Sequence, residues 1–284
     1  MKIITWNIQV ALGVDGKVDI PRIADVIKEL GDSDVICLQE ITRASSLDAS
    51  GNNISSYGLA DDLAARFPEY KMHYGPAVDR EEAEGRYYFG NMILSKVPVN
   101  WVFSHRLPQP ADPTTRTMPR QSLEVILTFN GEPLRIMTTH LEYFAVGQRK
   151  AQLEYLASYQ AECCERHARP SPSGVGSYVA PPETDRTIMC GDFNMEANLE
   201  HYKYFTTGTG EFIDAWNAVH GNVPHTPTCG IYDIEQWPDG EHCRDFFFLS
   251  PSLASFATEL RVNTDTQASD HQPLMLTLDQ NSAR

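Results

Sequence analysis

A largely apolar run at residues 187–190 stops abruptly at the polar turn Gly191-Asp192-Phe193-Asn194. Apolar side chains of this kind are typical of a buried strand, and glycine lets the backbone turn at its end. In open α/β sheets, ligands bind beyond the ends of strands, so Asp192 and Asn194 could both face one cleft. The alternative is a turn in which Asp192 only accepts backbone hydrogen bonds. This segment alone does not decide between the two interpretations.

Polar side chains at the ends of apparent strands recur along the whole chain. They are carboxylates, histidines and amides, which carry protons, donate hydrogen bonds or bind hard cations such as Mg²⁺ or Mn²⁺, and the set suits zinc less well. Each has an ordinary alternative as a surface histidine, a turn asparagine or a helix cap. If the strand ends converge, however, the side chains form one site. They are Asn7, Glu40, His140, Asp192 with Asn194, and Asp270 with His271.

The elements that must position these residues are strands, with helices at wide spacing. Strands predominate, which favours a layered α/β sandwich over a simple doubly wound sheet. The loops at 42–56, 78–87, 111–119 and 220–242 are expected to line the rim, and the Pro/Ser/Gly-rich segment 169–184 is expected on the surface, as a connector or a lid. We predict strands at 2–7, 34–39, 70–74, 88–95, 101–105, 122–129, 134–139, 246–250 and 273–278, and helices at 20–30, 59–67, 146–166 and 199–205.

The composition predicts one globular domain over residues 1–284, because 42% of the residues are hydrophobic and no long linker divides the chain. The formal charge of −15 disfavours nucleic acid and anionic membranes as partners. We expect no stable membrane association, because the N-terminal segment lacks the layout of a signal peptide and no apolar run is long enough to span a membrane. Six scattered cysteines without metal-type spacing are expected to be reduced thiols in a cytoplasmic protein.

The chain resembles the endonuclease/exonuclease/phosphatase superfamily, the DNase I-like metal-dependent phosphohydrolases. The resemblance implies a four-layered α/β sandwich, in which two packed mixed β-sheets are flanked by helices, with an active site at one edge. The matching motifs occur in the family's order and span nearly the whole chain. They are Thr5-Trp6-Asn7, Leu38-Gln39-Glu40, Gly90-Asn91-Met92-Ile93-Leu94-Ser95, Thr138-Thr139-His140-Leu141, Gly191-Asp192-Phe193-Asn194, Arg244-Asp245-Phe246-Phe247-Phe248 and Ser269-Asp270-His271.

The resemblance also implies a cofactor, Mg²⁺ or Mn²⁺. Glu40 would be the principal ligand of this cation. Asn7 and Asp270 would lie close by, as ligands directly or through water.

Five residues would carry the chemistry if the resemblance holds. His271 would activate or orient the attacking water, or stabilise the charged transition state, and Asp245 would hold its second ring nitrogen. Asp192 would handle the proton of the leaving or attacking oxygen. Asn194 and His140 would donate hydrogen bonds to non-bridging phosphate oxygens. Which residue is the base and which the acid stays open.

Three further residues could contact the substrate. Arg120 and Arg86 could each bind a second phosphate or another substrate anion, with a surface ion pair as the alternative. Asn91 is expected to shape the floor of the site or to have a structural role. Arg149 and Gln152 could face the cleft or water.

The substrate is the least defined part of the prediction. Apurinic-site endonucleases of this superfamily carry Tyr-x-Pro-Asn where this chain has Thr139-His140-Leu141-Glu142. We therefore predict a Mg²⁺- or Mn²⁺-dependent hydrolase that cleaves a small, soluble phosphodiester or phosphomonoester by in-line attack of water. One alternative is a sugar-nonspecific nuclease on DNA or RNA. Another is a non-catalytic binding module that retains the fold. No protein partner can be inferred.

Overall fold

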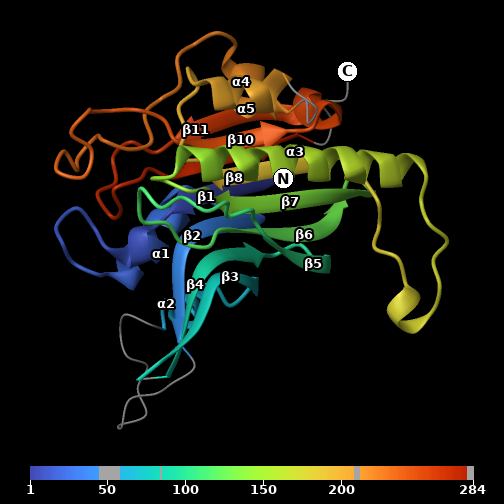
Figure 1. The fold of residues 1–284 in the computed structure, drawn as a ribbon, viewed down its shortest axis with the longest axis horizontal. Coiled ribbons are helices and arrows are strands. Elements are labelled where there is room, and N and C mark those ends of the chain that lie inside the picture. Colours follow the sequence, from blue (N-terminus) through green and yellow to red (C-terminus); the bar gives the residue numbers. More distant parts are fainter. Residues whose placement is uncertain (45–57, 84, 208–211, 280–284) are drawn as a thin grey trace.

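The computed structural model describes residues 1–44, 58–83, 85–207 and 212–279. Two six-stranded mixed sheets pack face to face, and helices cover their outer faces (Figure 1). This arrangement confirms the predicted four-layered sandwich. In spatial order the first sheet contains β11 (Ala257–Val262), β12 (Leu274–Leu278), β1 (Lys2–Asn7), β2 (Val35–Ala44), β4 (Gly85–Ser95) and β3 (Lys71–Glu82), and the second contains β5 (Val99–Arg106), β6 (Gln121–Phe129), β7 (Glu132–His140), β8 (Thr187–Asp192), β10 (Asp245–Leu249) and β9 (Ile213–Asp214).

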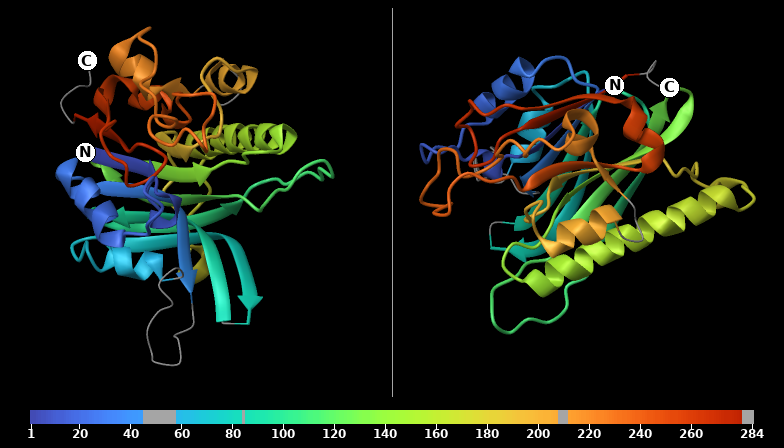
Figure 2. Two further views of the ribbon diagram at one scale, coloured as in Figure 1. Left: turned by 90° about the vertical axis from the view of Figure 1, so that its left-hand side faces the viewer. Right: turned by 90° about the horizontal axis from the view of Figure 1, so that it is seen from above.

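Three hydrophobic clusters hold the layers together. The first lies between the sheets and includes Cys37 of β2 and Cys190 of β8. The second joins the first sheet to α1 (Ile20–Glu29) and α2 (Leu59–Ala64), and the third joins the second sheet to α3 (Val146–Ala168) and α4 (Glu200–Thr207). Figure 2 shows α1 and α3 on opposite outer faces of the sandwich. A fifth helix, α5 (Ala215–His220), packs beside β10 and β11.

The strand directions bring the polar strand ends to one edge. β1 runs parallel to β2 and pairs Asn7 with Gln39, the neighbour of Glu40. β7 runs parallel to β8 and pairs His140 with Asp192, while β10 is antiparallel and begins where β8 ends. Because parallel strands finish on the same side of a sheet, their terminal side chains meet there.

Two local distortions aim the side chains at this edge. β2 has an irregularity in its pairing with β4 between Leu38 and Ile41, and Glu40 within it has a φ of 59°. Bulges of this kind redirect a side chain at the end of a ladder. Gly191 has a φ of 129°, and a Cβ there would lie 2.0 Å from the carbonyl oxygen of Thr139. Only glycine fits at this position, so the turn before Asp192 depends on it.

Several predicted elements differ from the structure. β2 continues to Ala44, so residues 42–44 are strand, and most of the predicted loop 42–56 lies outside the described residues. The predicted rim loop 78–87 is instead the outer part of the hairpin of β3 and β4, where both strands continue their pairing. Sequence analysis also missed β9, α5 and β11.

The segment 169–184 is largely exposed and contains the short helix Gly176–Tyr178. It follows the far end of α3, as the yellow chain in Figure 1 shows. Within the described part of the chain, none of the helices is long and apolar enough to cross a membrane.

Candidate active site

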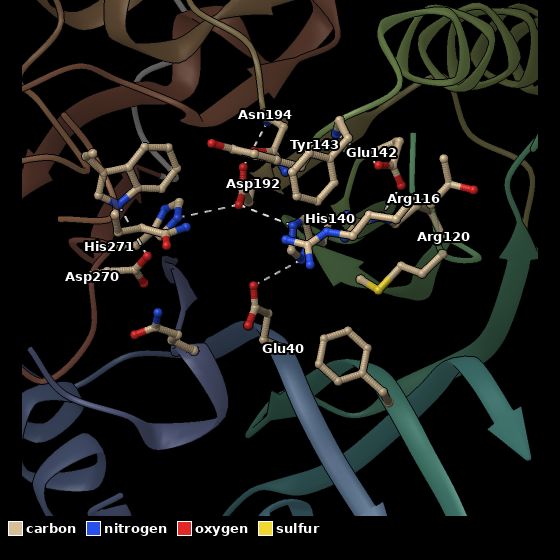
Figure 3. A pocket seen from close by; sticks show the side chains of 17 residues that line it. Glu40, Arg116, Arg120, His140, Glu142, Tyr143, Asp192, Asn194, Asp270 and His271 are labelled. Carbon is tan, nitrogen blue, oxygen red and sulfur yellow. Dashed lines mark hydrogen bonds and ion pairs between the residues drawn. The ribbon is translucent and has the colours of Figure 1, made fainter. Parts of the chain in front are cut away.

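A cavity of about 430 Å³ opens at the edge where the strand ends meet (Figure 3). Its position agrees with the general placement of ligand sites beyond strand ends. Seven of the eleven predicted site residues line it: Glu40, Arg120, His140, Asp192, Asn194, Asp270 and His271. Its other lining residues are Gln9, Phe89, Arg116, Thr117, Met118, Glu142, Tyr143, Phe144, Gln236 and Trp237.

His271 and Asp245 form a buried pair beside the cavity. Nδ1 of His271 donates to Oδ2 of Asp245 at 2.8 Å, and Oγ1 of Thr228 donates to the same oxygen at 2.6 Å. Burial lowers the pKa of His271, but the carboxylates of Asp245, Asp270 and Asp192 outweigh it and raise that pKa well above the usual value. The imidazole is therefore positively charged at neutral pH, with Nε2 3.7 Å from Asp192.

Asp192 lies at the centre of the site, and both of its carboxylate oxygens accept hydrogen bonds. Its Oδ1 accepts the backbone N–H of Asn194 at 2.8 Å, and its Oδ2 accepts Nδ2 of Asn7 at 3.0 Å. Burial raises the pKa of Asp192, but His140, His271 and these hydrogen bonds outweigh burial and hold the pKa below the usual value. Asp192 is thus a carboxylate that can accept a proton.

His140 differs from His271 in its charge state. Burial, followed by the nearby guanidinium of Arg120, lowers the pKa of His140 to about 3. Its Nε2 is 3.4 Å from Oδ2 of Asp192, and its Nδ1 is 3.8 Å from Oε1 of Glu40. A neutral imidazole has a single N–H, so His140 is suited to donate one hydrogen bond rather than to supply charge.

The acidic side of the cavity has the chemistry of a cation site. Glu40 is about a quarter exposed, and partial burial together with the facing carboxylate of Asp270 raises the pKa of Glu40 to about 7. Two carboxylates in this position repel each other, and a divalent cation between them would relieve the repulsion. Glu40 and Asp270 therefore fit the predicted ligand roles by residue type and charge.

Asn7 lies next to the predicted ligand Glu40, as expected from the sequence. Its Oδ1 accepts the backbone N–H of Gln9 at 3.1 Å, which fixes the orientation of the amide. Its Nδ2 faces the carboxylates and donates to Glu40 at 3.1 Å and to Asp192 at 3.0 Å. In this arrangement the amide nitrogen of Asn7 positions two carboxylates, and its oxygen is turned toward the backbone of Gln9.

A second group of potential metal ligands includes the hydrogen-bonded pair of His271 and Asp245. One ligand atom each from Asp192, Asp245 and His271 lies within 4.8 Å of the others. His271 and Asp245 already share the 2.8 Å hydrogen bond, however, which occupies the ring nitrogen facing Asp245. Among the described residues, Glu40 and Asp270 have no such mutual hydrogen bond, so their carboxylates are more available to a cation than the Asp245–His271 pair.

The predicted substrate residues fall in three places. Arg120 lines the cavity and donates from Nε to Glu142 at 3.2 Å. Asn91 is buried outside the lining, and its Nδ2 donates to the backbone oxygen of Gln121 at 2.9 Å, beside Arg120. Arg86 does not reach the cavity, because it is exposed on the β3–β4 hairpin and pairs with Asp79 at 2.6 Å.

Sequence analysis missed the support around the site. Thr228, which donates a hydrogen bond to Asp245, lies in no motif that would mark it as part of the site. Trp237 is buried and lines the cavity, where its Nε1 donates to Asp270 at 3.3 Å. Arg149 and Gln152 face neither water nor the cavity lining, and both hold the backbone of Glu142.

The sequence profile of the Endonuclease/Exonuclease/phosphatase family matches residues 4–271. The chain belongs to this family. The match spans all the site residues from Asn7 to His271, so the family's phosphohydrolase character applies to the domain that builds the cavity. No protein among curated sequences matches the chain.

Several solved structures share the fold. A protein of this family from Beutenbergia cavernae is 24% identical, with a TM-score of 0.68 over 98% of this chain and 71% of that chain. A Bacteroides thetaiotaomicron mannosyl-6-phosphatase is 16% identical, with a TM-score of 0.68 over 98% and 99%. The human Nocturnin catalytic domain, solved with a bound sulfate anion, is 20% identical, with a TM-score of 0.61 over 98% and 93%.

Proposed function

We propose that this family member hydrolyses a small, soluble phosphate ester with the help of Mg²⁺ or Mn²⁺. The observation that carries the proposal is a cavity lined by His271, Asp192 and Glu40, beside which Asp245 holds His271 through a buried hydrogen bond. A cavity of about 430 Å³ is at the lower end of the range for small-molecule sites and has room for a compact ester.

His271 and His140 would have different roles in the reaction because they differ in charge. Attack on phosphorus builds negative charge on the non-bridging and leaving oxygens, and preorganised positive groups and donors are most effective there. The charged His271 would stabilise this negative charge, with Asp245 fixing its ring. The neutral His140 would donate one hydrogen bond to a phosphate oxygen, as would the second amide hydrogen of Asn194, whose first goes to Leu141.

Asp192 is the residue best placed to take a proton from the attacking water. Its pKa is low in the free protein, and its Oδ2 lies between the two histidines. A cation held by Glu40 and Asp270 would polarise the phosphate and neutralise developing charge. Asn7 keeps Glu40 and Asp192 in position through its amide group.

The formal charge of −15 and the small cavity support a soluble ester over a polynucleotide. The cysteines support a location in the cytoplasm. All six are free, which fits a reducing compartment such as the cytoplasm.

The test is hydrolysis of bis-p-nitrophenyl phosphate and p-nitrophenyl phosphate, with and without Mg²⁺ or Mn²⁺. Wild type should turn over at least one ester only with metal, and Asp192→Asn and His271→Ala should lose most of the rate. If wild type equals both variants under every metal condition, the protein is a binding module and the proposal fails. Preferential, salt-sensitive cleavage of oligonucleotides would favour the nuclease alternative.

A further inference from the structure

The cavity has three chemically different parts. Asp270 and His271 lie at one side, Glu40, His140 and Asp192 at the centre, and Arg116 and Arg120 at the opposite side (Figure 3). The hydrolytic residues occupy only the first side and the centre, so the proposed reaction leaves the arginine side unexplained.

Arg120 is built into the wall with an unused donor. Arg120 is 5% exposed and its Nε donates to Glu142. Its Nη1 has no hydrogen-bond partner among the described residues. Buried guanidinium groups normally satisfy all their N–H donors, and an orphaned one costs free energy. Arg120 also lines the cavity, so a ligand there would lie beside this guanidinium group, although Nη1 itself is shielded from solvent.

Arg116 adds a second cation from the 111–119 loop. It is exposed at the cavity, its guanidinium lies 4.5 Å from the centre of the Phe144 ring, and no described carboxylate forms an ion pair with it. Glu142 also lines this side and offsets one positive charge, while one of its oxygens is taken by the backbone N–H of Phe144. The arginine side thus keeps a net positive charge in a chain of charge −15.

Apolar side chains line the cavity together with the arginines. Phe89, Met118 and Phe144 line the same cavity, and Phe144 packs against Tyr143 with ring centres 4.7 Å apart. A substrate that reaches the arginines would lay a flat or apolar part against these side chains.

We infer that the natural substrate carries a second anionic group, a phosphate or a carboxylate, which binds Arg116 and Arg120 while the scissile phosphate lies between Glu40, His140 and Asp192. An apolar or ring-shaped spacer would join the two groups. The inference rests on the proposed function and names its substrate class. Fork-shaped guanidinium groups suit both anions, because each presents two oxygens to paired N–H donors.

The experiment uses two aryl phosphates that differ chiefly in one charge: 4-(carboxymethyl)phenyl phosphate and 4-ethylphenyl phosphate, each also as the methyl diester. With Mg²⁺ or Mn²⁺, the wild type should prefer the carboxylate ester by about tenfold in kcat/KM, mainly through KM, as one charge-assisted bond at a partly exposed arginine allows. The preference should weaken as salt is raised.

Variants assign the preference to this side of the cavity. Arg116→Gln and Arg120→Lys should each reduce the ratio of the two kcat/KM values, and Arg116→Lys should retain part of it. The matched control is Arg169→Gln, which removes the same charge from an exposed arginine at the far end of α3. A ratio near one in wild type, or a ratio that the arginine variants leave unchanged, overturns the inference.

A binding measurement keeps the two proposals separable. Benzylphosphonate and 4-(carboxymethyl)benzylphosphonate are not hydrolysed, so calorimetry on the metal-loaded protein reports the second anion without turnover. Tighter binding of the carboxylate compound that is lost in Arg116→Gln supports the inference even if neither ester is cleaved. Equal binding of both compounds overturns it even if both esters are cleaved.

Discussion

Replacing Asp245 by asparagine would test how the charged histidine is maintained. Asp245 is the carboxylate closest to His271, with Oδ2 2.8 Å from Nδ1, and the pair is buried. An asparagine keeps the shape of the side chain but removes the charge. A charge-assisted hydrogen bond contributes about 1.5–3 kcal/mol, so kcat should fall roughly 10- to 150-fold.

The pH profile gives the direction of the change. In wild type the carboxylates of Asp245, Asp270 and Asp192 raise the pKa of His271, so the imidazolium persists above neutral pH. The raised pKa of His271 also contributes to folding stability. This contribution is complete at pH values below the pKa of His271 in the unfolded chain, and it is lost as pH rises through its pKa in the folded protein. In Asp245→Asn that folded pKa falls. The alkaline limb of kcat should therefore move to lower pH.

The assay is the rate of bis-p-nitrophenyl phosphate hydrolysis from pH 5 to 10 at saturating metal. A matched control exists in a second, partly buried pair, in which Oδ2 of Asp214 lies 2.7 Å from Nε2 of His225, a histidine outside the cavity lining. Asp214→Asn should lower the melting temperature and leave the pH profile of kcat in place. The reasoning is refuted if a folded Asp245→Asn protein keeps a third or more of the rate with an unchanged profile, or if Asp214→Asn shifts the profile equally.

Three further predictions concern the cation, the core and the turn. Because burial and the carboxylate of Asp270 raise the pKa of Glu40 to about 7, Mn²⁺ affinity by calorimetry should fall about tenfold per pH unit below that value, and equal affinity at pH 6 and 8 would contradict a raised Glu40 pKa at the cation site. Glu124→Gln removes the buried negative charge that pairs with Arg135, whose Nε lies 2.8 Å from Oε1 of Glu124. The free energy of unfolding in urea should fall by about 3–5 kcal/mol, and a fall of less than about 1 kcal/mol would contradict a stabilising role of this pair. Gly191→Ala should lower stability by more than about 1 kcal/mol and reduce activity, because φ is 129° there, and wild-type behaviour would show that the turn tolerates a side chain.

The sequence was sufficient to predict the strands that carry Asn7, His140 and Asp192. Each strand is a short apolar run that ends at a polar residue, and this pattern is local. The order of the motifs then supplied the two-sheet architecture. The strand β9 could not be predicted in this way, because two residues carry no periodicity and its pairing with β10 depends on the packed sheet.

Side-chain partners were harder to predict than strand ends. Arg86 precedes the Gly90-Asn91 motif in the sequence, yet β4 is extended there and puts Arg86 roughly 13 Å along the strand from Gly90. Thr228 and Trp237 reach Asp245 and Asp270 from a loop whose course depends on tertiary packing. Such contacts join residues far apart in the chain, and no local pattern encodes them.

The central claim is that this cavity hydrolyses a phosphate ester with a divalent cation held by Glu40. The most direct measurement is the rate of bis-p-nitrophenyl phosphate hydrolysis by chelator-stripped protein during titration with Mg²⁺ or Mn²⁺. We predict a rate near background without metal, a saturable rise for wild type, and a much weaker response in Glu40→Gln. Hydrolysis that is equally fast in chelator, or equal titration curves for wild type and Glu40→Gln, would contradict the account.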